Sequence, residues 1–261
     1  MKLLFVGDIM GSGGREAFCQ AAPEFKRDGR ADVIVVNGEN SAAGKGITPK
    51  ICEQLFAAGA DVITLGDHTY DQREIMPYLD QEPRVLRPAN YAEGCPGRGM
   101  HTVETPAGSL TVMVLVARVF MDPVDCPFRK ADQLLGPAHK RAKAVFLDFH
   151  GEATSEKVAM GWYLDGRVSA VVGTHTHVQT ADERVLPKGT AYLSDAGMTG
   201  PRDSVIGCET EPILKRFLTG LPVRMQPAPT ASWLHGALIE IDHLTGRALS
   251  IRRVQEGPFG P

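Results

Sequence analysis

Cysteine is scarce and widely scattered in this sequence of 261 residues, which limits the crosslinks and metal sites that the chain can form. The five cysteines are odd in number and include no Cys-x-x-Cys pair. A disulfide framework and a thiolate zinc site are therefore both disfavoured. Any metal bound by this chain must use nitrogen and oxygen ligands.

Long hydrophobic runs and excess positive charge are also missing. No run approaches the length of a membrane span, and the apolar stretch after Lys2 is too short for a signal peptide, so we expect a cytoplasmic protein with no membrane partner. The formal net charge of −3 argues against an extended nucleic-acid surface. A nucleotide substrate held at one site stays compatible with that charge.

The composition is that of an ordinary globular protein, with 43% hydrophobic and 23% charged residues. The length fits one α/β domain over residues 1–261, although length alone also allows two domains. Short apolar runs predict buried strands at 2–6, 31–36, 61–65, 110–116, 144–149, 168–172 and 191–197. Helices are predicted at 15–28, 48–58, 72–80 and 152–164, an irregular flap at about 87–140, and an antiparallel hairpin at 237–254.

Side chains able to bind metal follow five of these predicted strands. They are Asp8, the pair Glu39-Asn40, the pair Asp67-His68, His150, and the pair His175 and His177. Open α/β sheets place their chemistry at the carboxyl ends of strands. Taken singly, Asp8 could instead cap the helix near residue 15, and Glu39 could belong to a turn. Five such strand ends in one chain favour a shared site.

The sequence Gly173-Thr174-His175-Thr176-His177 carries two imidazoles one residue apart. In extended backbone, His175 and His177 would face the same side, roughly 7 Å apart at about 3.3 Å per residue. That spacing suits two neighbouring metal ions, whereas an isolated pair is more often two surface or core histidines. The strand ends supply seven candidate ligands and one further His, enough for two ions. Nitrogen and oxygen ligands suit manganese, iron or zinc, and two close ions are the usual apparatus for phosphate-ester hydrolysis.

These motifs resemble a known family. Gly66-Asp67-His68, His150 and the His-Thr-His segment are similar to the motifs of calcineurin-like metallophosphoesterases. Gly7-Asp8-Ile9, Asn37-Gly38-Glu39-Asn40-Ser41-Ala42 and Asp195-Ala196-Gly197-Met198-Thr199-Gly200-Pro201 resemble the bacterial YmdB-type branch, and the resemblance extends over about residues 1–255. It implies a four-layer α/β sandwich, with two mixed sheets flanked by helices, and a phosphodiesterase of cyclic nucleotides such as 2′,3′-cyclic AMP.

The resemblance also implies a role for each strand-end residue. One metal ion would be held by Asp8, Glu39, Asn40 and His177, and a second by Glu39, Asp67, His150 and His175. His68 would be the catalytic proton donor, and Arg118 is a candidate substrate contact whose alternative is a solvated surface Arg. Iron or manganese is favoured over zinc.

Two positions depart from the wider superfamily pattern. Met10 stands where many members have a His, and Asp67 replaces the usual Asn. Asn40 would substitute for the missing His, and Asp67 adds a negative charge to the site. Phosphodiester hydrolysis by a metal-activated water is the leading function. A phosphomonoesterase, or a metal-binding regulatory protein with little turnover, remains open, as does a homo-oligomer.

Overall fold

Strand β1 (Lys2–Val6) shows how the sequence builds the fold, because both of its faces are apolar. In the computed structural model, which describes residues 1–260, Leu3 and Phe5 enter the core between two sheets. Leu4 and Val6 point to the opposite side, into a core covered by helices. Alternate residues of a strand face opposite ways, so a continuous apolar run suits a strand buried on both faces.

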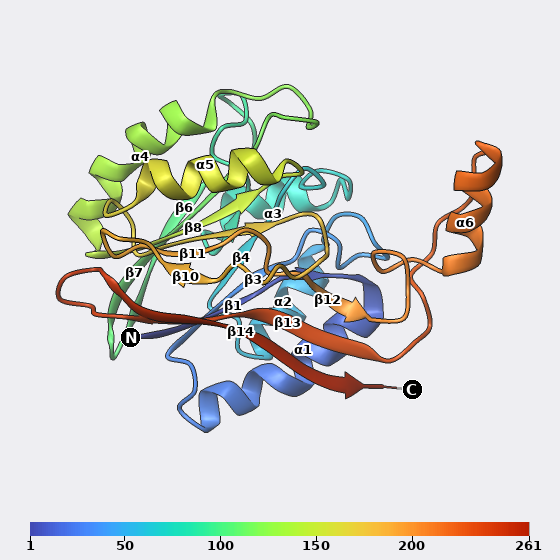
Figure 1. Cartoon of the computed structure of the whole chain (residues 1–261), viewed down its shortest axis with the longest axis horizontal. Helices are drawn as coiled ribbons and strands as arrows, with labels where there is room; N and C mark the ends of the chain where they lie inside the picture. The colour runs from blue at the N-terminus through green and yellow to red at the C-terminus, as the bar shows by residue number, and fades with distance from the viewer. Residues whose placement is uncertain (261) are drawn as a thin grey trace.

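Two mixed sheets pack face to face, and helices cover both outer sides (Figure 1). The first sheet, sheet 1, has the order β2-β12-β13-β1-β3-β4-β5, and β14 also pairs with β13. Sheet 2 has the order β10-β11-β9-β8-β7-β6. Helices α1, α2 and α3 pack on sheet 1, while α4 and α5 pack on sheet 2. The predicted four-layer α/β sandwich is therefore confirmed.

The strands of sheet 1 are β1, β2 (Asp8–Ile9), β3 (Val33–Asn37), β4 (Val62–Thr64), β5 (Val85–Leu86), β12 (Met198–Pro201), β13 (Ser232–Ile241) and β14 (Ala248–Phe259). Those of sheet 2 are β6 (Met100–Thr105), β7 (Gly108–Val116), β8 (Ala144–His150), β9 (Ala170–Thr174), β10 (Arg184–Val185) and β11 (Ala191–Leu193). Strands β1, β3 and β4 are parallel to one another, as are β7, β8 and β9, so their carboxyl ends form one edge in each sheet.

The helices are α1 (Gly11–Arg27), α2 (Pro49–Ala57), α3 (Ile75–Gln81), α4 (Pro127–Arg141), α5 (Thr154–Leu164) and α6 (Thr210–Thr219). Helix α6 stands away from the sheets in Figure 1. Within residues 1–260, no helix combines the length and the apolar character that crossing a membrane requires.

The start of the first helix and the character of the expected flap differ from the prediction. Helix α1 begins at Gly11 and not near residue 15, and its N-cap is Met10, so Asp8 is not a helix cap. Asp8 instead lies in β2, which pairs with β12. Much of the segment expected to be an irregular flap at about 87–140 is regular, because it contains β6, β7 and α4. Its two longer stretches without helix or strand lie between Leu86 and Met100 and between Val116 and Pro127. The single domain over residues 1–261 stays a prediction.

His235, on β13, predicts how the stability of the fold depends on pH. Burial, helped by the charge of Arg202, lowers the pKa of His235 to about 4, and neither ring nitrogen has a hydrogen-bond partner within residues 1–260. The unfolded chain therefore binds more protons between about pH 6.5 and about pH 4, so the free energy of unfolding decreases as the pH falls through that window. We expect His235→Leu to remove ~2–3 kcal/mol of this acid sensitivity.

Urea denaturation at pH 7.5 and pH 4.5 measures the effect as the difference between the two unfolding free energies. His243→Leu is the matched control, because His243 is exposed in the turn between β13 and β14. If His235→Leu and the parent lose the same stability between the two pH values, His235 does not stay neutral in the folded chain.

Candidate metal centre

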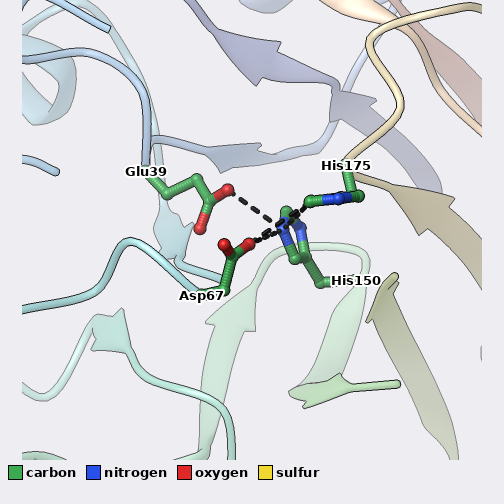
Figure 2. Close-up of side chains that lie close together, drawn as sticks. All are labelled: Glu39, Asp67, His150 and His175. Atoms are coloured by element: carbon green, nitrogen blue, oxygen red, sulfur yellow. Dashed lines mark hydrogen bonds and ion pairs between the residues drawn. The ribbon is translucent and has the colours of Figure 1, made fainter. Parts of the chain in front are cut away.

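Four of the predicted ligands meet where the two sheets face each other (Figure 2). Glu39 follows β3 and Asp67 follows β4, both in sheet 1. His150 is the last residue of β8, and His175 follows β9, both in sheet 2. One ligand atom from each of the four lies within 4.8 Å of those from the other three. The strand ends of both sheets therefore supply one compact group of nitrogen and oxygen donors.

Nε2 of His150 is the atom on which this group converges. It lies 2.9 Å from Oδ1 of Asp67, 3.0 Å from Oε1 of Glu39 and 3.1 Å from Nδ1 of His175. His150 is fully buried, and Glu39 is almost so. Two imidazoles and two carboxylates at such distances form a set that suits a divalent ion such as manganese, iron or zinc.

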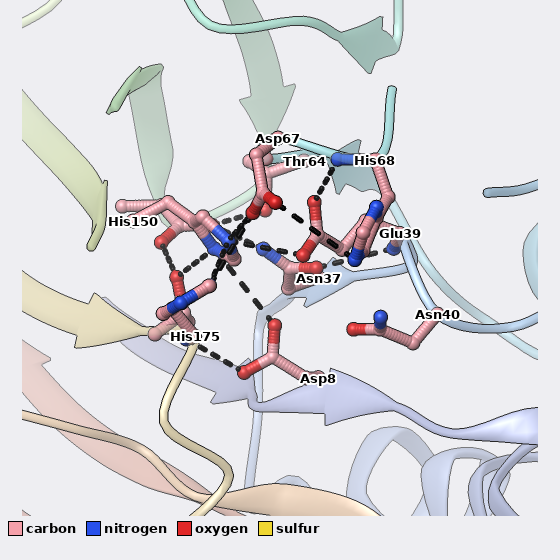
Figure 3. A network of polar contacts seen from close by, with 12 residues as sticks. Asp8, Asn37, Glu39, Asn40, Thr64, Asp67, His68, His150 and His175 are labelled. Carbon is pink, nitrogen blue, oxygen red and sulfur yellow. Dashed lines mark hydrogen bonds and ion pairs between the residues drawn. The ribbon is translucent and has the colours of Figure 1, made fainter. Parts of the chain in front are cut away.

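Asp8, Asn40 and His177 lie outside this group of four but border it. Oδ1 of Asp8 is 3.9 Å from Nδ1 of His150, and Oδ2 accepts a hydrogen bond from the backbone N–H of His175. Figure 3 shows Asp8 and Asn40 on the same side of Glu39. Nε2 of His177 lies 3.2 Å from Oδ1 of Asn40. The structure therefore brings all seven predicted ligands into one region.

The charges of the site call for a cation. Asp8 is fully buried, and its Oδ1 has no hydrogen-bond partner in the described part of the chain. Burial, which outweighs the attraction of His150, raises the pKa of Asp8 to about 7. An unpartnered buried carboxylate oxygen is costly, and a metal ion is a partner that would offset this cost. The donor set thus fits a bound metal ion.

His150 compensates for part of this negative charge. Burial by itself raises the pKa of Glu39 and of Asp67, but the charge and hydrogen bonds of His150 outweigh burial and hold both values below their ordinary range. In return, although burial opposes it, these carboxylates raise the pKa of His150 well above its usual value. The carboxylates thus stabilise positive charge at the point where the ligands converge.

The turn after β9 differs from the prediction that His175 and His177 lie in extended backbone. Strand β9 ends at Thr174, and His175 and His177 have φ values of 100° and 64°, a region that non-glycine residues rarely occupy. Oδ2 of Asp195 accepts hydrogen bonds from both the backbone N–H and the hydroxyl of Thr176 between them.

Asp195 is itself held by a buried ion pair. Nζ of Lys157, on α5, lies 2.7 Å from Oδ2 of Asp195, and the two side chains are 3% and 2% exposed. Strained backbone persists where its surroundings over-determine it. The Lys157–Asp195 pair supplies that constraint at Thr176 and so orients the two flanking histidines. The prediction of extended backbone at His175 and His177 was wrong because the local sequence pattern does not contain this tertiary contact.

A second layer of buried polar groups orients His150. The Thr174 hydroxyl donates to Oδ1 of Asp148 at 2.6 Å and lies 2.9 Å from Nδ1 of His150. Because that hydroxyl proton goes to Asp148, the hydroxyl accepts the Nδ1 proton of His150, which directs Nε2 to the site. Asp148 also accepts hydrogen bonds from Thr64 and Asn37, two residues that Figure 3 shows beside His150.

This layer of polar groups was not predicted from the sequence. Its signal was a lone carboxylate, Asp148, inside the otherwise apolar run that ends at His150. Charged residues are almost never fully buried without partners, so such a residue in a buried strand predicts a polar network.

One of the two residues predicted to act on the substrate, His68, lies beside the predicted ligand Asp67. His68 is 25% exposed, with Nε2 3.8 Å from Oδ2 of Asp67 and Nδ1 3.1 Å from Oδ2 of Asp71. Its backbone N–H donates to Oε2 of Glu39. Arg118 has an exposed side chain, and its backbone N–H donates to the carboxylate of Glu156. The roles of both residues stay predictions.

Comparisons with known proteins agree with this site and fold. A 2′,3′-cyclic-nucleotide 2′-phosphodiesterase of Bacillus subtilis (strain 168) is 51% identical over 254 residues, which are 97% of this chain and 96% of that protein. A hypothetical protein from Thermus thermophilus has a crystal structure that matches with a TM-score of 0.92 and 42% identity, over 98% of this chain and 99% of that chain.

The crystal structure of a phosphatase from Mycoplasma pneumoniae matches with a TM-score of 0.91 and 32% identity, over 98% of this chain and 93% of that chain. The family model described as YmdB-like protein matches residues 4–254. A match over nearly the whole chain, together with relatives of this similarity, confirms the predicted resemblance: the chain belongs to the YmdB-like family.

Proposed function

We propose that this protein is a metal-dependent phosphodiesterase that hydrolyses cyclic nucleotides such as 2′,3′-cyclic AMP. The observation that carries the proposal is the convergence of nitrogen and oxygen donors from four strand ends on Nε2 of His150. The Bacillus subtilis relative, named for this reaction, is 51% identical over nearly the full length of both chains, which supports the substrate class.

The proposed centre holds two metal ions. Glu39, Asp67, His150 and His175 would bind one ion, and Asp8, Asn40 and His177 would bind the other together with Glu39. Support for the second ion comes from Oδ1 of Asp8. This atom is buried without a hydrogen-bond partner in the described part of the chain, and Asp8 lies outside the group of four ligands. Bound metals would supply hydroxide at neutral pH and neutralise charge on the phosphoryl oxygens.

His68 is the proposed proton donor to the leaving oxygen. Opening a cyclic phosphodiester breaks one P–O bond and leaves a ribose oxygen that must gain a proton. Nδ1 of His68 lies 3.1 Å from Asp71, so the imidazole has a carboxylate partner and its Nε2 faces the metal centre (Figure 3). The exposed Arg118 is proposed to contact the substrate phosphate.

Finer features of the protein are proposals as well. Iron or manganese is favoured over zinc for a site of mixed carboxylate and imidazole ligands. All five cysteines are free thiols, which suits a reducing compartment such as the cytoplasm. A homo-oligomer remains a prediction.

The function is tested by the turnover of two ester classes. The protein, loaded separately with manganese, iron or zinc, should hydrolyse 2′,3′-cyclic AMP and bis-p-nitrophenyl phosphate faster than p-nitrophenyl phosphate, and EDTA should abolish all three activities. Faster monoester hydrolysis would identify a phosphomonoesterase. No turnover with any of the three metals would refute the proposed activity.

His68→Ala tests the proton donor. General acid catalysis typically contributes 10²–10⁴-fold, and it matters most when the leaving group is basic. We expect a loss of about 10²-fold or more in kcat for 2′,3′-cyclic AMP, whose leaving group is an alkoxide, and a much smaller loss for bis-p-nitrophenyl phosphate. Metal content should not change, and His243→Ala is the control at an exposed histidine. Equal losses on both substrates would contradict this role.

Asp67→Asn tests the effect of the extra carboxylate. Two divalent ions carry four positive charges, which Asp8, Glu39, Asp67 and one hydroxide would neutralise. The hydrogen bonds of His150 and His175 hold the pKa of Asp67 low against the effect of burial, so its charge is present near neutral pH. Removing that charge should tighten binding of inorganic phosphate roughly ten-fold and lower the KM for phosphodiesters.

Isothermal titration calorimetry with phosphate measures the binding, and elemental analysis must show the same metals in both proteins. Asp203→Asn is the control, because it removes an exposed carboxylate that has no side-chain partner within residues 1–260. Unchanged phosphate affinity with equal metal content would mean that Asp67 is not coupled to the centre.

A further inference from the structure

A cavity of about 600 Å³ opens beside the metal centre and has Asp67 in its wall. Tyr70 and Tyr91 also line it, and Val116, Asp122 and Asp125 belong to the segment that borders it from sheet 2. Its volume lies in the range of about 300–1,000 Å³ that is typical of small-molecule sites. A ligand anchored at the metal centre could therefore extend into this cavity past Asp67.

The aromatic wall of the cavity is held in place. The ring centroids of Tyr70 and Tyr91 are 5.9 Å apart, with an angle of 40° between the planes. The Tyr70 hydroxyl donates to the carbonyl of Pro96 at 2.8 Å, and the Tyr91 hydroxyl donates to the carbonyl of Gly66 at 3.0 Å. Gly66 directly precedes Asp67, so Tyr91 is tied to the loop that carries a proposed metal ligand. Ordered aromatic rings of this kind are surfaces on which nucleobases stack.

The charge of the cavity selects against a second phosphate. Asp67, Asp122 and Asp125 contribute three carboxylates, and no Lys or Arg among the described residues lines the cavity. Neither Asp122 nor Asp125 has a side-chain hydrogen bond or ion pair within residues 1–260. Free carboxylates accept hydrogen bonds from N–H donors, which the exocyclic amino groups of adenine, guanine and cytosine supply.

We propose that this cavity is the subsite for the base of the nucleotide whose phosphate lies at the metal centre, with Tyr91 as its stacking residue. The inference rests on the proposed function and adds the recognition of the nucleoside to it. The base would stack against the tyrosine wall, while Asp122 and Asp125 would accept hydrogen bonds from its amino group. Amino-bearing bases are therefore preferred over uracil.

The experiment compares two substrates that share the same five-membered cyclic phosphate. Glycerol 1,2-cyclic phosphate lacks the base that 2′,3′-cyclic AMP carries, so only the nucleotide can use the cavity. The metal-loaded protein should show a lower KM for 2′,3′-cyclic AMP. Tyr91→Leu should raise that KM roughly ten-fold or more and change kcat/KM for glycerol 1,2-cyclic phosphate much less.

Two variants separate stacking from other effects. Tyr91→Phe keeps the ring, so its KM for 2′,3′-cyclic AMP should stay close to that of the parent. If the KM of Tyr91→Phe rises as much as that of Tyr91→Leu, loss of the hydroxyl and not of stacking explains the increase. Phe217→Leu, at an exposed aromatic residue of α6 outside the cavity, should change neither substrate. Retained turnover of glycerol 1,2-cyclic phosphate shows that each variant is folded and metal-loaded.

The carboxylates are tested by base preference. The double variant Asp122→Asn and Asp125→Asn can donate hydrogen bonds to the carbonyl groups of uracil, so the ratio of kcat/KM for 2′,3′-cyclic AMP over 2′,3′-cyclic UMP should fall. The subsite is overturned if Tyr91→Leu changes both cyclic phosphates equally or neither, or if Tyr91→Phe behaves like Leu. Failure of the parent to hydrolyse either substrate would instead overturn the proposed function, and the subsite with it.

Discussion

Negative charge buried where the two sheets meet is the constraint on which the site depends. Asp8, Glu39 and Asp148 are each at most 1% exposed. Asp148 is satisfied by protein groups alone, because Asn37, Thr64 and Thr174 donate hydrogen bonds to it. Among the described residues, Asp8 and Glu39 each accept a hydrogen bond from one backbone N–H, that of His175 and that of His68, and from no neutral side chain. Their charge is offset by His150 and, on the proposed function, by metal ions.

The residues that orient the proposed metal ligands are different from the ligands themselves. Thr174 and Asp148 fix the ring of His150 from behind, and the buried Lys157–Asp195 pair fixes the turn that carries His175 and His177. Asp148 and Thr174 lie on β8 and β9, Lys157 lies on α5, and Asp195 follows β11. The layers of the sandwich that form the core therefore also set the geometry of the site. A cavity beside Asp67 then offers room for the part of a substrate that does not react.

The family resemblance implied the four-layer sandwich, whereas local patterns in the sequence predicted the buried strands and the location of the site. Apolar runs of two-sided strands such as β1 identify buried parallel sheets, and polar side chains directly after those runs identify their shared edge. The predictions failed where contacts between residues far apart in the sequence determine the local structure. Nothing near His175 in the sequence indicates that Asp195 will hold the turn at residues 175–177 in a conformation with positive φ values. Nothing near residue 100 indicates that β6 will form the edge of sheet 2.

A crystal structure of the protein grown with manganese, with anomalous difference maps collected at the metal edge, tests the dinuclear site most directly. Two peaks per chain should lie about 3.5–4 Å apart, one within the group of Glu39, Asp67, His150 and His175 and the other beside Asp8, Asn40 and His177. Glu39 should contact both. A single peak, or peaks away from these residues, would contradict a two-metal centre built from the strand ends of both sheets.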